Sequence, residues 1–109
     1  MDADSVPRTT ASPRSPATAS VAGELRRIQE RWRVLPLDRA TGYSGRVRTL
    51  VQQLADDLAL SGGARTEPVP DLGPATLMDQ LAVVVYDAGE AGRSDGLAVE
   101  LAALRRLIS

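Results

Sequence analysis

The chain has 109 residues, a net charge of -1 and a sequence pI of about 5.3. This length is sufficient for one domain with a modest core, and the charge gives no general attraction to nucleic acid or to an anionic membrane. Cysteine, histidine and lysine are absent, which excludes disulfides, thiolate or imidazole metal ligands, a histidine base, a Schiff-base amine and a Walker lysine.

The N-terminal segment, residues 1–19, is rich in proline, serine and threonine and contains almost no large apolar side chain. Such a segment cannot bury enough apolar surface to offset the entropy lost on ordering. We therefore predict a disordered tail over residues 1–19 and a helical domain over residues 20–109.

A first helix is predicted from Ser20, a suitable N-cap, to the residue before Pro36, which disfavours continued helix. Its apolar residues recur at intervals of three and four, so they share one helical face. Trp32 lies within this stripe and is expected to be a core anchor. The stripe consists of Val21, Leu25, Ile28, Trp32 and Leu35.

A second helix is predicted from a cap at Asp38 to the breakers "SGG" at residues 61–63. Gly42 and Gly45 weaken its start, so two interpretations remain open: the helix begins near Ser44, or the glycines allow another backbone to approach closely. The apolar positions are Tyr43, Val47, Leu50, Val51, Leu54 and Leu58.

The stretch at 74–90 contains the strand-like run "LAVVVY" between helix signals. Pro74 suits the first position of a helix and Gly89 suits a left-handed C-cap, while a strand would have no partner elsewhere in the chain. A third helix is therefore predicted over 74–88, apolar over a wide arc because it is the most enclosed element. The preceding loop, residues 62–73, is long enough to run along the whole bundle.

A fourth helix is predicted over 94–108, and because the chain ends within its pattern we expect the last turn to fray. Its stripe is Leu97, Leu101, Leu104 and Ile108. Four amphipathic helices predict an all-α fold, a small antiparallel bundle built from two helical hairpins.

Charge is unevenly distributed along the chain. Residues 1–48 contain nine arginines and five acids, and residues 49–109 contain four arginines and nine acids, so the two parts carry +4 and -5. Either basic and acidic helices pack side by side and screen each other, or a basic face is kept for an acidic partner. The candidate partner-binding residues of such a face are Arg27, Arg31, Arg46 and Arg48.

Catalytic chemistry has little support in the sequence. A di-metal bundle needs inward-facing acids with an E-x-x-H pattern, which is absent. Asp56 and Asp57 are adjacent and so point in different directions on a helix. We expect no enzymatic activity, no cofactor and no metal.

The favoured hypothesis is a helical adaptor or regulatory protein that binds another protein or itself, for example as a homodimer. The alternative is a nucleic-acid-associated regulator that uses the arginine face, although the acidic pI and the absence of lysine oppose it. A third hypothesis is a pocket for a small apolar ligand, with Tyr43 or Tyr86 as its polar group. No apolar run approaches the 18 to 20 or so residues that span a bilayer, so we expect a cytoplasmic protein, and the composition suggests a GC-rich bacterial source.

Overall fold

The computed structural model describes residues 16–109. Within this part of the chain the regular structure is entirely helical, as predicted. The four helices are α2 (Pro16–Val34), α3 (Leu37–Ser61), α4 (Pro74–Glu90) and α5 (Ser94–Ile108).

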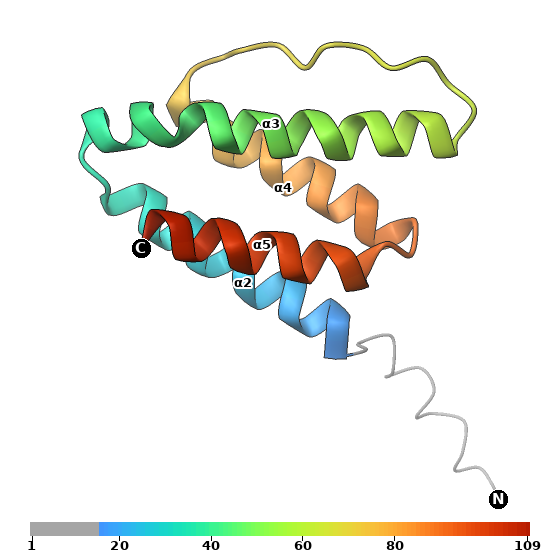
Figure 1. The fold of residues 1–109 in the computed structure, drawn as a ribbon, viewed down its shortest axis with the longest axis horizontal. Coiled ribbons are helices and arrows are strands. Elements are labelled where there is room, and N and C mark those ends of the chain that lie inside the picture. Colours follow the sequence, from blue (N-terminus) through green and yellow to red (C-terminus); the bar gives the residue numbers. More distant parts are fainter. Residues whose placement is uncertain (1–15) are drawn as a thin grey trace, which may run out of the picture.

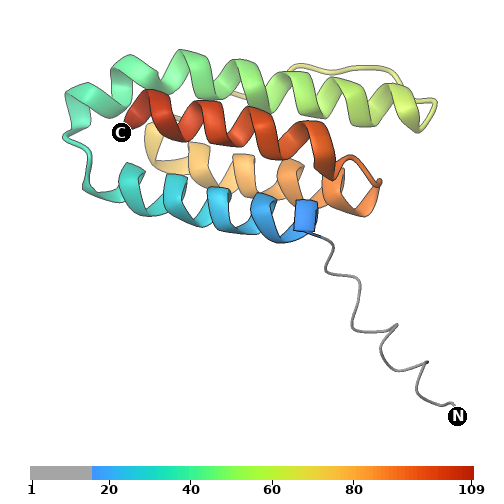
Figure 2. The same cartoon turned by 60° about the horizontal axis from the view of Figure 1, so that its bottom comes forward.

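The helices form two layers, with α3 beside α4 in one layer and α2 beside α5 in the other (Figures 1 and 2). Helices joined by short turns run in opposite directions, as the predicted hairpins require. The loop 62–73 returns along the length of α3, so α3 and α4 run in the same direction (Figure 1). This crossover confirms that the long loop spans the bundle, and it makes each layer a parallel pair stacked antiparallel on the other.

The core is formed by the predicted apolar stripes. Ile28, Leu81, Leu101 and Ile108 have no exposed surface, and Ser44 is the one buried polar residue in the described part of the chain. The hydroxyl of Ser44 donates to the carbonyl of Ala40 at 2.8 Å, which satisfies it inside the helix. A core of leucine, isoleucine, valine and alanine with one tryptophan is therefore continuous between the two layers.

The run "LAVVVY" is helical, which confirms the choice of helix over strand. Pro74 is the first residue of α4, as predicted, but Gly89 lies inside the helix and is not a left-handed C-cap. Gly92, with φ of 78°, takes the left-handed conformation instead. The expectation that α4 is enclosed holds only in part, because its Val83 and Tyr86 side chains are exposed.

Two predicted helix starts are wrong. Helix α2 begins at Pro16, so Ser20 lies inside it, because proline at the first position and the alanines that follow favour helix. Helix α3 begins at Leu37, so Asp38 lies in its first turn and is not its N-cap. The negative charge of Asp38 there interacts favourably with the helix dipole. The predicted tail thus loses residues 16–19 to α2, and its remainder lies outside the described residues.

Gly42 and Gly45 fit neither sequence interpretation, since α3 is already helical at both and a Cβ added at either would meet no atom within 4 Å. We therefore expect Gly42→Ala and Gly45→Ala each to raise the free energy of unfolding by about 0.5–1 kcal/mol, because alanine loses less backbone entropy in a helix. Thermal denaturation followed by circular dichroism measures this. Gly92→Ala is the matched control and should destabilise, because its φ is positive.

Candidate functional site

The four arginines predicted to form a partner face lie on two helices with different neighbours. The Nε of Arg31 on α2 donates to the carbonyl of Ile108 at the end of α5, at 2.8 Å. Arg48 on α3 pairs with Asp71 of the loop, at 3.0 Å. Arg27 and Arg46 are exposed. Arg31 therefore contacts α5, whereas Arg48 contacts the loop 62–73.

Several basic side chains surround Glu24 where α2 packs on α5. Arg105 donates two hydrogen bonds to the Glu24 carboxylate across this contact. Hydrogen bonding to Arg105 is the main cause that lowers the pKa of Glu24, and the charges of Arg105, Arg27 and Arg106 lower it further. The pair is partly buried and joins an acid of the basic half of the chain to an arginine of the acidic half.

Glu24→Gln should lower the free energy of unfolding by about 1 kcal/mol near neutral pH. Since the folded-state pKa is depressed, this contribution is complete above the unfolded pKa, about 4.3 for glutamate, and is lost as pH falls through the lower folded value. Urea denaturation of both proteins from pH 7 to pH 3 tests it. A difference that grows on acidification would contradict the ion-pair explanation.

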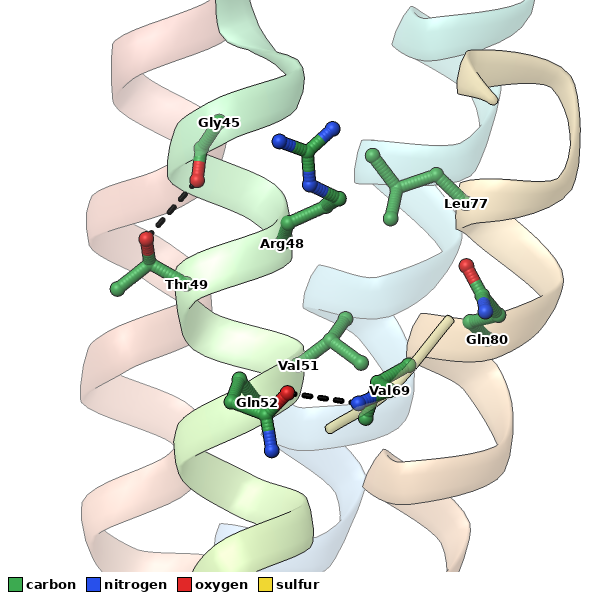
Figure 3. A pocket seen from close by; sticks show the side chains of 8 residues that line it. All are labelled: Gly45, Arg48, Thr49, Val51, Gln52, Val69, Leu77 and Gln80. Carbon is green, nitrogen blue, oxygen red and sulfur yellow. Dashed lines mark hydrogen bonds between the residues drawn. The ribbon is translucent and has the colours of Figure 1, made fainter. Parts of the chain in front are cut away.

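The loop 62–73 is fastened to α3 and α4 by side chains around a small hollow (Figure 3). The Gln52 carbonyl accepts from the Val69 amide at 2.8 Å, and its amide group donates to the Glu67 carbonyl at 3.0 Å. Gln80 donates to the Pro70 carbonyl at 2.9 Å. Because these polar groups already bond to the loop, the side chains around the hollow hold the crossover in place. Sequence reasoning missed both glutamines, since neither belongs to a motif.

The adjacent carboxylates Asp56 and Asp57 point to different partners, as their spacing predicted. Asp56 accepts a hydrogen bond from Gln52 on its own helix, and Asp57 pairs with Arg93 in the turn before α5, at 3.4 Å. Within residues 16–109, no group of three or more potential ligands is arranged to hold a metal ion. Nor does any described helix have the length and apolar character needed to cross a bilayer.

An apolar hollow of about 390 Å³, the end hollow, opens where α2, α3 and α4 meet. Its wall includes Trp32, whose Nε1 donates to the carbonyl of Pro74 at 3.1 Å. Val34 at the end of α2 and Leu37 at the start of α3, 68% and 73% exposed, flank the short connection at the same end of the bundle. The lining residues are Gln29, Trp32, Arg33, Leu35, Leu37, Ala40, Pro74, Ala75 and Met78.

The outer face of α4 combines exposed apolar and acidic residues. Val83 and Tyr86 are 59% and 67% exposed and lie one helical turn apart. Every charged residue of α4 is acidic: Asp79, Asp87 and Glu90. Tyr86 lines none of the hollows described above, so it is not placed as the polar group of a pocket.

No family model, curated protein or solved structure matches this chain. Its function must therefore be inferred from its own residues.

Proposed function

We propose that the protein is a non-enzymatic helical adaptor or regulatory protein that binds another protein through the end hollow. The supporting observation is an apolar hollow whose lining includes the exposed side chain of Leu37. Exposed apolar groups of this kind mark interaction surfaces when they are contiguous with a concave site. Partner side chains that fill such pockets contribute much of the binding energy at protein interfaces.

The chemistry of the hollow favours an apolar anchor from the partner. Trp32 forms part of the apolar lining although it is only 8% exposed, and Met78 is flexible enough to adapt to different side chains. Because the Trp32 indole N–H already donates to the Pro74 carbonyl, Trp32 contributes only apolar surface to the lining of the hollow. Arg33 is the only charged residue in the lining, and it would favour an acidic group beside the anchor.

The test is a pull-down from native lysate followed by reconstitution with the purified partner. Leu37→Asp should abolish recovery, because it places a charge beside the apolar hollow. Val99→Asp is the matched control, since Val99 is equally exposed but lies on α5. Trp32 fluorescence should change when the purified partner is added to wild type. Equal recovery by both variants, or no partner at all, would refute this site.

Binding to nucleic acid is the second candidate, and the exposed arginines of α2 and α3 are its support. We expect no duplex or single-strand binding at physiological ionic strength, because the chain has a net charge of -1 and its acids oppose the attraction of the arginines to phosphate groups. A salt titration of nucleic-acid binding compares wild type with a variant in which four residues are changed to Gln: Arg26, Arg27, Arg33 and Arg46. Arg31 and Arg48 are left unchanged. Micromolar affinity that falls steeply with salt and disappears in the variant would favour the nucleic-acid role.

A further inference from the structure

The two helical hairpins of the bundle, α2–α3 and α4–α5, pack on each other far more than their own helices pack together. Within residues 16–109, the most extensive contacts are those of α2 with α5 and of α3 with α4, and each joins one hairpin to the other. Helices α2 and α3 have almost no backbone positions close together, although a short turn connects them. Neither hairpin is therefore a packed unit by itself, and each is completed by the other.

The side-chain hydrogen bonds between helices follow the same division. Arg105 of α5 donates to Glu24 of α2, and Arg31 of α2 donates to a carbonyl at the end of α5. Trp32 of α2 donates to the carbonyl of Pro74 in α4. Because only the loop between α3 and α4 joins the hairpins covalently, the same contacts can form between hairpins of two different copies of the chain.

The loop 62–73 follows a long path within a single chain. Since α3 and α4 run in the same direction, the loop must return from Ser61 to the level of Ala40, which lines the end hollow together with Pro74 (Figure 1). This distance along α3 is roughly 25–30 Å, and a loop of this length reaches about 40 Å when fully extended. Side-chain amides of α3 and α4 hold the loop on this path.

An exchanged dimer avoids the long path. Two bundles side by side, related by a two-fold axis perpendicular to the helices, bring the end of α3 in one bundle next to the start of α4 in the other. We infer that two copies exchange hairpins when the loop is released from α3, so that each bundle contains α2–α3 of one copy and α4–α5 of the other. Each end hollow is then shared, with Trp32 and Leu37 from one copy and Pro74 and Met78 from the other.

The loop keeps wild type closed at low protein concentration. Within one chain the hairpins meet at an effective concentration of about 1 mM, as expected for a short linker, so the exchanged dimer needs a protein concentration near or above this value. Exchange also requires the bundle to open, because neither hairpin is packed alone. A dimer that has formed should therefore separate as slowly as the protein unfolds. The inference does not depend on a protein partner at the end hollow.

Shortening the loop tests the exchange. Removal of residues 64–71 keeps Gly62, Gly63 and Gly73 beside the helix ends, but the loop that remains reaches only about 15–18 Å and cannot return along α3. The control replaces the same residues with an equal number of glycines and serines, so it loses the same contacts and keeps the length. Sedimentation velocity at about 20 μM, far below the effective concentration, should show a dimer for the shortened protein and a monomer for the control. A shortened protein that is monomeric or unfolded, or a control that is also dimeric, would overturn the inference.

A charge exchange distinguishes hairpin exchange from an ordinary dimer. Two shortened proteins are made, one with Glu24→Arg and the other with Arg105→Glu, so that each alone has like charges at this partly buried contact between α2 and α5. In an exchanged heterodimer, position 24 of each copy meets position 105 of the other, which restores an ion pair in both bundles. The two proteins refolded together should therefore have a higher melting temperature than either one alone. A mixture that is no more stable than its components would rule out hairpin exchange.

The role of the loop contacts is tested in the chain with its complete loop. Gln52→Ala removes two hydrogen bonds from α3 to the loop, and these bonds belong to the closed chain alone. After refolding at about 1 mM, the dissociation constant of its dimer should be at least about tenfold lower than that of wild type. Gln53→Ala, an exposed neighbour on the same helix, is the matched control and should behave like wild type. Equal dimer fractions for Gln52→Ala and wild type would contradict the inference that release of the loop drives exchange.

Discussion

Trp32→Ala should produce the largest loss of stability of any single substitution in this chain. Trp32 is 8% exposed and contacts the end of α4 through its hydrogen bond to Pro74. Replacing a buried tryptophan with alanine costs about 3–5 kcal/mol, out of a total of about 5–15 kcal/mol for a domain of this kind. The melting temperature should therefore fall by at least about 12 °C, measured by circular dichroism.

Two further measurements separate the causes of this loss. Trp32→Phe keeps an aromatic ring but loses the five-membered ring of the indole together with its hydrogen bond to Pro74, so it should cost less than Trp32→Ala, about 1–3 kcal/mol. The emission of the wild-type protein should be blue-shifted from that of tryptophan in water, because the ring is mostly buried. Emission at the water-exposed position, or a Trp32→Ala melting temperature within a few degrees of wild type, would contradict burial.

The sequence predicted the helices and the core because both depend on local periodicity. Residues spaced by three and four, such as Leu77 and Leu81 of α4, share a helical face whatever surrounds them, and both are buried. The caps were less predictable: Ser20, Asp38 and Gly89 each have the right chemistry, but helix boundaries depend on neighbouring turns and packing.

The surfaces could not be predicted in the same way. The end hollow joins Trp32, Leu37 and Met78 from three helices, and their proximity depends on the crossover that makes α3 and α4 parallel. Arg31 shows the same limit: its sequence context suggests an exposed charge, whereas its contact is the carbonyl of Ile108, 77 residues away. Predicting such contacts requires the order of the helices in space.

The last turn of α5 differs most from the sequence prediction, and a substitution there should have the second large effect on stability. We predicted that the last turn frays, but Ile108 has no exposed surface and Ser109 donates its hydroxyl hydrogen bond to the Arg105 carbonyl. The guanidinium of Arg31 also caps this helix end, where a positive charge is favourable to the helix dipole. The terminal turn is thus held by burial and by a cross-helix hydrogen bond.

Ile108→Ala should therefore lower the free energy of unfolding by about 2–5 kcal/mol, since it leaves a cavity between α2 and α5. Val99→Ala on the exposed side of α5 should change it by less than about 0.5 kcal/mol. Urea denaturation of both variants measures the difference. A loss below about 1 kcal/mol for Ile108→Ala would mean that the last turn frays after all.

A double variant that combines Ile108→Ala with Arg31→Gln tests what holds the last turn of α5 in place. Arg31 binds the backbone carbonyl of residue 108, an acceptor that alanine keeps, so the two losses should add if the turn stays folded in Ile108→Ala. If removing the isoleucine instead unwinds the turn, the hydrogen bond is already lost, and Arg31→Gln should cost nothing further. We expect additivity within about 0.5 kcal/mol, because the Ser109 hydroxyl and the flanking Leu104 still anchor the helix end. A combined loss no larger than that of Ile108→Ala alone would show that the isoleucine side chain is what keeps this turn helical.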